Sequence, residues 1–358
     1  MNTSFLQPEL NYLYEEMRGD ASGLTFRDVR TAPFRICGLY RPETEPYLHR
    51  LPENVAEATS AGVADLQQCT AGGRIRFRTN SARIAIAAQI PGVKLRPHLT
   101  LLSSTGFDLY ETTGGACVFV HAYKPSTDRF DAIVGKVTLG ERKMRELTLN
   151  LPLYGKVTTL EIGLDDDAEL LPPQPYAVEK PVVFYGSSIT QGACASRPGM
   201  CYEAWISRRL DCDYINLGFA GNCKGEPAIV QYMAGLEMSA FVCDYDHNAP
   251  TSAHLRATHE PIYRAVRASH PDIPILLLTK PDYRFGSDDS DDRREIVMDT
   301  YRKGRAAGDR NLYFIDGASL FAGADRAECT VDGCHPNDLG FYRMADAVGT
   351  ALKAALNR

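Results

Sequence analysis

The sequence predicts a two-domain protein in which an all-β sandwich precedes an α/β domain with a doubly wound, five-stranded parallel sheet. The chain has 358 residues, more than the roughly 250–300 at which a single hydrophobic core stops growing. Short strand-like segments fill its first half, and short apolar runs alternate with amphipathic stretches in its second half. We therefore expect a sandwich at residues 1–170, a linker at 171–181 and the α/β domain at 182–358.

The first half has the pattern of antiparallel β structure. Apolar and polar residues alternate over Ile75–Phe77 and Ile84–Ile90, and Gly, Pro or Asn bounds each run. Turn signals recur at the short spacing of antiparallel sheets, which predicts a jelly-roll-like sandwich. Further strands are expected at His98–Ser103, Cys117–Tyr123, Arg145–Leu149 and Thr158–Leu164. In this half only Glu53–Gln68 carries a partly helical pattern.

The boundary between the two patterns is the segment Leu170–Pro181. It holds four of the 21 prolines of the chain. Proline cannot donate a hydrogen bond to a neighbouring strand and it interrupts helices, so this composition is typical of a linker.

The second half has the pattern of a parallel sheet with crossover helices. Strands are expected at Val182–Tyr185, Tyr214–Phe219, Phe241–Tyr245, Ile273–Thr279 and Leu312–Ile315. Helices are expected at Pro227–Leu236, Ser252–Ser269 and Arg293–Ala307, and a last helix carries Phe341, Met344, Val348 and Leu352 on one face.

The charge balance excludes several classes of partner. Lys and Arg total 39 against 45 for Asp and Glu, a net charge of −6, so no basic field exists to hold nucleic acid or anionic lipid. No run of 18 apolar residues and no basic start followed by an apolar core occurs, which predicts neither a membrane span nor a signal peptide. We expect a cytoplasmic protein, and the sequence leaves a homo-oligomer open.

The ten cysteines do not predict a disulfide framework. They are spread from Cys37 to Cys334 in a chain without an export signal, so we expect small buried hydrophobic residues. Cys329, Cys334 and His335 come nearest to a metal pattern but lack paired CxxC spacing.

The acidic run Ser287–Asp292 is expected to be a solvated loop before a helix, with calcium binding as the alternative. We expect no metal and no cofactor.

Candidate catalytic residues follow the predicted strands, because doubly wound sheets bind ligands beyond the carboxyl ends of their strands. Ser188 lies on a glycine-flanked turn after the first strand, where it either exposes a nucleophilic hydroxyl or caps the next helix. A serine nucleophile needs a base oriented by a third group. His335, with Asp332 three residues earlier in DGCHPND, can supply both. The alternative is a capping Asp beside an incidental surface His.

Two further positions can supply donors to an oxyanion. Gly221 follows the second strand in NLGFAGN, and its backbone N–H can approach a ligand closely because no side chain intervenes. Asn248 follows the third strand in DYDHNAP and carries a neutral NH₂ donor. The alternatives are an ordinary turn glycine and a helix cap or Asx turn.

Taken in order, these four blocks resemble those of the SGNH hydrolases, also called the GDSL esterase family. GSSIT matches the nucleophile block and DGCHPND matches the final DxxH block, and the resemblance covers Pro181 to the C-terminus. It implies a flavodoxin-like fold with Ser188 as nucleophile, His335 as base and Asp332 as its orienting group. It also implies an oxyanion hole formed by the Ser188 backbone N–H, Gly221 and Asn248.

The chain departs from the family pattern at two places. Ser187 stands where the family usually has Asp. Many members have GxND around the oxyanion Asn, whereas this chain has Asp246, His247, Asn248 and Ala249, so an imidazole and the carboxylates of Asp244 and Asp246 are expected to crowd the pocket. His247, His254 and His259 are expected to bind substrate or serve helix structure, and a metal cluster is the alternative.

The two-domain arrangement looks like that of several microbial carbohydrate esterases. It implies a serine esterase that hydrolyses small acyl esters, acetyl esters above all, of a carbohydrate or another small hydroxylated compound. The alternatives are an acyltransferase that passes the acyl group to an alcohol, and a catalytically inactive carbohydrate-binding protein. Whether the sandwich binds carbohydrate or only shapes the site stays open, since Tyr110, Phe119, Tyr123 and Phe130 are expected in the core or at the rim.

Overall fold

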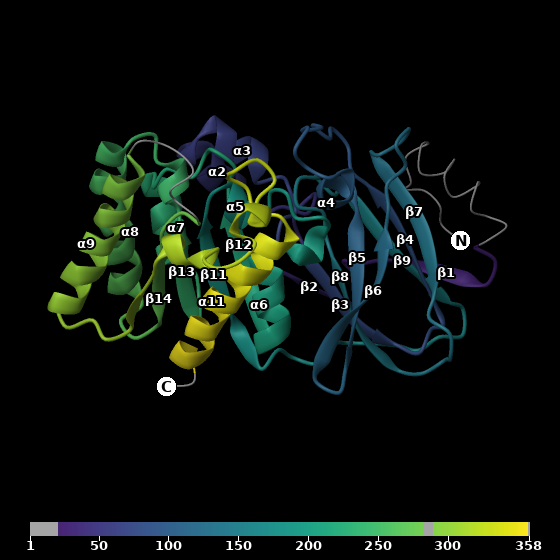
Figure 1. The fold of residues 1–358 in the computed structure, drawn as a ribbon. Coiled ribbons are helices and arrows are strands. Elements are labelled where there is room, and N and C mark those ends of the chain that lie inside the picture. Colours follow the sequence, from purple (N-terminus) through teal and green to yellow (C-terminus); the bar gives the residue numbers. More distant parts are fainter. Residues whose placement is uncertain (1–20, 282–288, 357–358) are drawn as a thin grey trace.

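The computed structural model describes residues 21–281 and 289–356. Figure 1 shows a part built of β-strands beside a part in which helices surround a central sheet. Antiparallel sheets come first along the chain, and parallel strands alternating with helices follow. The predicted fold class, an antiparallel β region before an α/β region, is confirmed.

The β region is made of two antiparallel sheets. The first has the strand order β1 (Leu24–Asp28), β9 (Thr159–Asp165), β4 (Arg83–Gln89) and β7 (Ala132–Thr138). The second has the order β10 (Leu170–Leu171), β3 (Arg74–Thr79), β8 (Arg145–Asn150), β5 (Phe107–Thr113) and β6 (Ala116–Tyr123), with β2 (Arg35–Cys37) paired to β3. Buried side chains from both sheets, among them Phe77, Leu149, Ile86 and Ile162, form one core.

The prediction of a strand at His98–Ser103 is wrong. Thr100 caps a short helix there, α4 (Leu101–Thr105), and its Oγ1 accepts a hydrogen bond from the Ser103 N–H at 3.0 Å. The hydroxyls of Ser104 and Thr105 donate to carbonyls one turn earlier, which stabilises the helical turn. Strands β1, β2, β5, β7 and β10 were not predicted, whereas the other expected strands of this half are found within two residues of their predicted bounds.

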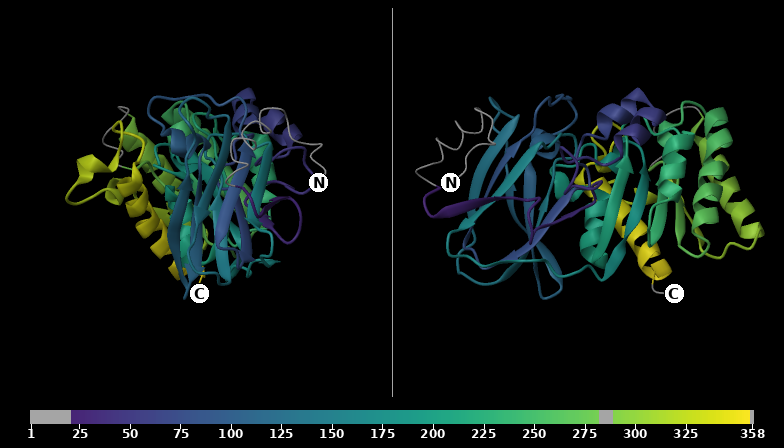
Figure 2. Two further views of the ribbon diagram at one scale, coloured as in Figure 1. Left: turned by 90° about the vertical axis from the view of Figure 1, so that its right-hand side faces the viewer. Right: turned by 180° about the vertical axis from the view of Figure 1, so that it is seen from behind.

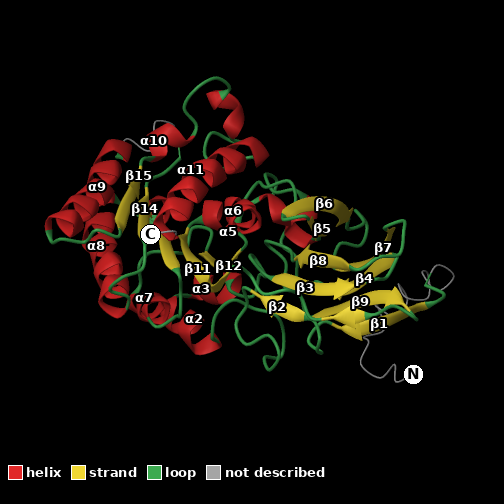
Figure 3. Ribbon diagram, turned by 90° about the horizontal axis from the view of Figure 1, so that it is seen from below, coloured by secondary structure: helices red, strands yellow, loops and turns green. Residues whose placement is uncertain are grey.

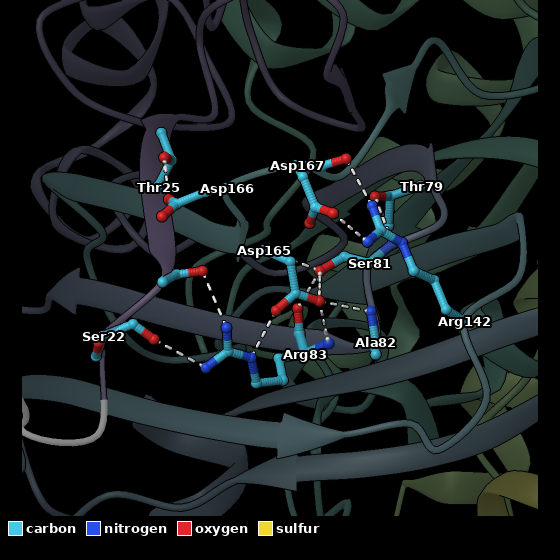
Figure 4. A network of polar contacts seen from close by, with 11 residues as sticks. Ser22, Thr25, Thr79, Ser81, Ala82, Arg83, Arg142, Asp165, Asp166 and Asp167 are labelled. Atoms are coloured by element: carbon cyan, nitrogen blue, oxygen red, sulfur yellow. Dashed lines mark hydrogen bonds and ion pairs between the residues drawn. The ribbon is translucent and has the colours of Figure 1, made fainter.

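A network of polar contacts surrounds Asp165 at the end of β9 (Figure 4). Its carboxylate accepts hydrogen bonds from the Ser81 hydroxyl at 2.9 Å, the Ala82 N–H at 2.8 Å and Arg83 Nε at 2.5 Å. Partial burial raises the pKa of Asp165, but these donors outweigh burial and hold the pKa below its ordinary value. The network therefore ties the turn before β4 to β9 through a carboxylate kept in its charged form.

The predicted helical segment Glu53–Gln68 forms two helices, α2 (Glu53–Thr59) and α3 (Ala61–Leu66). Their side chains Ala56 and Val63 belong to the core of the α/β region rather than to that of the sandwich. Figures 1 and 2 show these helices beside the α/β region, away from the strands that precede and follow them. The first half of the chain thus covers part of the second.

The α/β region is a five-stranded parallel sheet in the order β12 (Cys212–Gly218), β11 (Val178–Gly186), β13 (Ala240–Asp244), β14 (Ile275–Leu278) and β15 (Leu312–Ile315). The first strand lies between the second and the third, which is the flavodoxin-like order. All five strands were predicted. Between β10 and β11 the chain runs through residues 172–177 without regular structure.

Helices cover both faces of this sheet (Figure 3). Val182 and Phe184 of β11 share a core with α6 (Tyr202–Leu210) and α11 (Asp338–Leu356). Val183 and Tyr185 point to the opposite face and share a core with α7 (Pro227–Ala234), α8 (Ser252–Ser269) and α9 (Ser290–Ala306). This alternation explains the continuous apolar runs by which the strands were recognised. Helix α6 was not predicted.

Three further predictions concern a membrane-spanning helix, the acidic run before α9 and the state of the cysteines. No helix within residues 21–281 and 289–356 is long and apolar enough to cross a membrane. Asp291 and Asp292 lie in the first turn of α9 rather than in a loop before it, because negative charge is favoured at a helix N-terminus, while Ser287 and Asp288 lie outside the described residues. All ten cysteines are free thiols, and most are buried.

Candidate active site

Ser188 begins a helix directly at the carboxyl end of the central strand β11. Gly186 ends the strand, and a Cβ on it would lie 2.0 Å from Thr190 Oγ1 and 2.4 Å from the Asp244 carbonyl oxygen, so only glycine fits. Ser187 is the N-cap of α5 (Ser188–Gln191), because its Oγ accepts a hydrogen bond from the Ile189 N–H at 3.1 Å. The alternative that Ser188 merely caps this helix is therefore wrong, and its hydroxyl is available for chemistry.

The structure brings Ser188, His335 and Asp332 together. Ser188 Oγ lies 2.9 Å from His335 Nε2, although the two residues are far apart in the sequence. His335 Nδ1 lies 2.8 Å from one carboxylate oxygen of Asp332. The other oxygen of Asp332 accepts the backbone N–H groups of Cys334 at 3.0 Å and His335 at 2.8 Å. A hydroxyl, an imidazole and a carboxylate thus form one continuous hydrogen-bonded chain.

The Asp332 carboxylate is stabilised in its ionised form. Partial burial raises its pKa, but the hydrogen bonds from the His335 backbone and side chain and from Cys334 outweigh burial and lower the pKa to about 2. An ionised carboxylate can only accept at His335 Nδ1, so Nδ1 carries a hydrogen and Nε2 presents its lone pair to the serine hydroxyl. This is the tautomer that a general base requires.

Gly221 and Asn248 also lie together. The Gly221 N–H donates to Asn248 Oδ1 at 3.2 Å, and Asn248 Nδ2 donates to the Phe219 carbonyl at 2.8 Å. Both partners of Asn248 belong to the loop after β12, so the alternative of a local cap or Asx turn is wrong. Phe219 occupies one hydrogen of the Asn248 amide, which leaves the second for a ligand. The Ser188 N–H has no hydrogen-bond partner among the described residues.

A cavity of about 530 Å³ opens beside this pair of donors. Its lining is mixed, with apolar surface beside several cationic or neutral nitrogen groups. The lining residues include Gly221, Lys224, His247, Asn248, Lys280, Arg293 and Cys334. Because Cys334 precedes His335 directly, the cavity lies next to the imidazole. We take it as the candidate substrate site.

The expected crowding of the pocket by two carboxylates is only partly correct. Asp246 lines the cavity, where its Oδ2 accepts the Lys280 N–H at 3.0 Å and burial raises its pKa to about 6. Asp244 lies below the cavity, fully buried against Thr190 and Tyr202. Burial and the neighbouring Asp246 hold the pKa of Asp244 well above its ordinary value.

His247 lines the cavity and is neutral. Burial, Lys280, His335 and Arg293 hold the pKa of His247 well below its ordinary value. The alternative of a metal cluster with His254 and His259 is wrong. His254 Nε2 lies 2.8 Å from the Lys224 carbonyl oxygen, and His259 Nδ1 lies 2.9 Å from Thr300 Oγ1, so both hold helix α8 in place.

His98 is a neighbour of the site that sequence reasoning missed. Its imidazole stacks on that of His335, with ring centroids 5.3 Å apart and planes at 28°. The position of His98 depends on how a loop of the β region packs against the α/β region. Neither periodicity nor spacing along the sequence carries a signal of that packing.

Two buried residues of β5 hold the segment that follows α5. The Asp108 carboxylate accepts hydrogen bonds from Arg197 Nη1 at 2.7 Å and the Gly199 N–H at 2.9 Å. Tyr110 OH lies 2.6 Å from the same Arg197 nitrogen. Phe119, nearly half exposed, lies under the Arg197 guanidinium, while Tyr110 and Tyr123 are buried. The expectation that these aromatic residues belong to core or rim is thus confirmed for these three.

A hydroxyl, an imidazole and a carboxylate aligned in this way are the arrangement that serine hydrolases share on several unrelated folds. Residues 179–353 match the GDSL-like lipase/acylhydrolase family, and residues 24–170 match GxDLY, described as the N-terminus of SGNH-hydrolase-type esterases. The GxDLY motif reads GFDLY here and contains Asp108 and Tyr110. A search of functionally curated proteins finds no match.

Solved structures of similar proteins agree with these matches. A protein described as a GDSL-like lipase from Bacteroides ovatus is 31% identical, with 93% of this chain and 98% of that chain covered and a TM-score of 0.82. A salicylyl-acyltransferase from a tetracycline biosynthetic pathway is 20% identical (94% and 98% covered, TM-score 0.75). An acetyl xylan esterase from Butyrivibrio proteoclasticus is 12% identical (94% and 99% covered, TM-score 0.59). The chain belongs to the GDSL-like lipase/acylhydrolase family and is a carboxylic ester hydrolase.

Proposed function

We propose that the protein hydrolyses small acyl esters, acetyl esters above all, of a carbohydrate or another small hydroxylated compound. The observation that carries this proposal is the hydrogen-bonded chain from Ser188 through His335 to Asp332. Asp332 is held ionised, and each of the three groups has the hydrogen-bond partner that acyl transfer needs.

In the proposed reaction, Ser188 Oγ attacks the ester carbonyl carbon while His335 Nε2 takes its proton. The carbonyl oxygen becomes an oxyanion, which accepts hydrogen bonds from the N–H groups of Ser188 and Gly221 and from the Asn248 amide. As this intermediate collapses, His335 returns the proton to the departing alcohol and an acyl-serine forms. Water, activated by the same imidazole, then releases the acid and restores the serine.

Asp332 serves this cycle without changing its own charge. Its carboxylate stabilises the imidazolium that forms twice in each turnover. The Gly221 N–H, which donates to Asn248 Oδ1 in the free protein, turns to the substrate oxygen when the site fills. The Ser188 N–H contributes from the first turn of α5, where backbone donors have no partners within the helix.

The test is the hydrolysis of p-nitrophenyl acetate by the wild-type protein and by Ser188→Ala. We expect the variant to fold and to lose nearly all turnover, and we expect a fluorophosphonate to label the wild-type protein at Ser188 alone. Unchanged turnover in Ser188→Ala would falsify the assignment of the nucleophile. Labelling of a different serine would contradict it equally.

Acetylated carbohydrate as substrate is supported by the charged and polar side chains in the lining of the cavity and by the fold shared with an acetyl xylan esterase. A screen of acetylated sugars with the whole protein tests it. Release of acetate from at least one acetylated saccharide faster than from p-nitrophenyl acetate is the expected result. Equal inactivity on all saccharides would contradict a carbohydrate substrate but not ester hydrolysis.

An acyltransferase is the second candidate, and the fold shared with a salicylyl-acyltransferase favours it. The same acyl-serine would then pass its acyl group to an alcohol rather than to water. Product analysis with a sugar alcohol present distinguishes the two, since a transferase yields the new ester in preference to the free acid. The third alternative, an inactive carbohydrate-binding protein, has no need of an aligned Ser188, His335 and Asp332.

We further propose that the protein works in the cytoplasm. Ten free thiols, most of them buried, suit a reducing compartment better than an oxidising one. Fractionation of cells followed by detection of the protein with an antibody tests this, and recovery mainly from the medium or the envelope would contradict it.

A further inference from the structure

Three potential metal ligands from distant parts of the chain converge at the candidate active site. They are His98 from the loop between β4 and α4, Cys194 from the loop after α5, and His335. One ligand atom from each lies within 4.8 Å of the others, and no other group of this kind occurs within residues 21–281 and 289–356. The Cys194 thiol also contacts the His98 carbonyl oxygen at 3.3 Å, which ties the two loops together.

We propose that His98, Cys194 and His335 bind a divalent transition-metal ion of the zinc type, and that the bound ion reversibly inhibits the enzyme. Metal binding at this site does not depend on the proposed function, whereas inhibition rests on the proposed role of His335 as catalytic base. The ion would act as a regulator of the site rather than as a cofactor for the reaction.

The chemistry of the three groups selects the class of ion. Imidazole nitrogen and thiolate sulfur are preferred ligands of Zn²⁺, and three protein ligands leave a fourth position for water. Magnesium and calcium prefer oxygen ligands and are disfavoured by this set. The ring of His98 stacks on that of His335 but has no hydrogen-bond partner among the described residues, so ligation breaks no hydrogen bond of that ring.

The geometry requires only a small contraction. Zinc bonds of about 2.0–2.3 Å place tetrahedral ligand atoms roughly 3.5 Å apart. The ligand atoms must therefore draw together by up to about 1.3 Å, which rotation of the His98 side chain on its irregular loop can supply. The thiol of Cys194 gives its proton to solvent on binding.

Inhibition follows from what His335 already does. Its Nε2 accepts from the Ser188 hydroxyl, and its Nδ1 is held by Asp332. A metal bound to Nε2 takes the lone pair that must accept the serine proton. A metal bound to Nδ1 displaces the carboxylate that orients the ring. Either mode makes metal binding and turnover mutually exclusive.

The experiment titrates Co²⁺ and Zn²⁺ into the whole protein after treatment with EDTA. We expect one equivalent of Co²⁺ to produce a thiolate-to-cobalt absorption band. We expect Zn²⁺ to inhibit hydrolysis of p-nitrophenyl acetate, with recovery on adding EDTA. In Cys194→Ser and His98→Ala, the zinc concentration for half inhibition, measured against the metal-free rate of each variant, should rise at least about tenfold. Cys117→Ser, which removes a partly exposed thiol of β6 outside the group and outside the cavity, should behave like the wild-type protein.

A further variant separates this inference from the proposed function. Ser188→Ala keeps all three ligands, so it should show the same cobalt band whether or not Ser188 is the nucleophile. Absence of the band in the wild-type protein overturns the metal site while leaving esterase activity untouched. Retention of the band in Cys194→Ser, or of tight zinc inhibition in His98→Ala, overturns it as well. Should Cys194→Ser fail to fold, His98→Ala decides.

Discussion

The Asp108 carboxylate accepts a hydrogen bond from Arg197 Nη1 at 2.7 Å, across the contact between the β region and the α/β region. Next to Arg197, the backbone N–H and the hydroxyl of Ser196 donate to the Asp338 carboxylate at 2.8 and 2.6 Å. Asp338 begins α11, three residues after His335. A short chain of polar contacts therefore joins the β region to the loop that carries the candidate base.

This relationship predicts that Asp108→Asn is destabilising and lowers activity. Asp108 is fully buried, and its loss of charge leaves the Arg197 guanidinium without an anionic partner. Breaking such a pair from one side costs about 3 kcal/mol. Urea unfolding should show that loss, and the hydrolysis rate of the folded variant should fall as the Arg197 segment loosens.

The matched control is Asp65→Asn. Asp65 pairs with Lys94 at a similar distance, 2.7 Å, but both side chains are more than half exposed. Its loss should change the unfolding free energy by less than about 1 kcal/mol. Equal effects of the two variants would contradict a stabilising role for the Asp108–Arg197 pair.

Much of the α/β region was predictable because its strands are buried on both faces. Val182–Tyr185 reads as a continuous apolar run since alternate side chains enter two different cores. Ser188, Gly221 and Asn248 follow three such runs, so the position of each along the chain also fixes its place at the carboxyl edge. These residues could be found without knowing any tertiary contact.

Other features depend on contacts that no local pattern encodes. His98 meets His335 only because two regions pack together. The segment His98–Ser103 resembles a strand in composition, yet the hydroxyls of Thr100 and Ser104 make local hydrogen bonds that favour a helical turn. Strand β6 exposes Val118 and Phe119, so hydrophobicity does not separate its two faces cleanly.

We predict that Asn248→Ala folds but is severely impaired. Loss of one oxyanion donor costs about 3–4 kcal/mol of transition-state stabilisation, or a 10²–10³-fold drop in kcat. Steady-state hydrolysis of p-nitrophenyl acetate measures it, with circular dichroism as the check on folding. Asn248→Asp keeps the shape and the acceptor for the Gly221 N–H but loses both donor hydrogens, so it should be impaired at least as strongly. Near-normal kcat in both variants would remove Asn248 from the proposed mechanism.

We predict that Asp165 makes stability depend on pH in the acid range. Its pKa in the folded state is lower than its ordinary value of 3.8, since Arg83, Ser81 and two backbone N–H groups stabilise the carboxylate. A lowered pKa contributes stability that is fully present above the unfolded pKa and is lost as the pH falls through the folded pKa. Asp165→Asn should therefore lower the unfolding free energy by about 2 kcal/mol at neutral pH.

That difference should shrink once the pH falls below about 3.8, the ordinary pKa of the group. Urea unfolding of both proteins between pH 7 and the acid range measures it. Asp167→Asn is the control, because Asp167 pairs with Arg142 in the same network but has a largely exposed side chain. The Arg142 side chain also lowers the pKa of Asp167, but water screens this exposed pair, so the unfolding free energy of Asp167→Asn should stay much closer to that of the wild-type protein at every pH. A constant difference between Asp165→Asn and the wild-type protein would contradict the assigned pKa direction.

The lining of the cavity beside Asn248 predicts a preference for short acyl chains. An apolar groove would gain about 0.8 kcal/mol for each buried CH₂ group, so kcat/KM would rise from acetate to octanoate. Here an alkyl chain would instead displace water from Lys224, His247 and Arg293, whose polar groups it cannot satisfy. We expect kcat/KM to fall at least about tenfold along the p-nitrophenyl series from C2 to C8.

Lys224 has no side-chain partner among the described residues, so Lys224→Met should shift the profile toward longer chains while leaving Ser188 and His335 in place. A wild-type optimum at C6 or longer would contradict both the small-acyl assignment and the cavity as the acyl site.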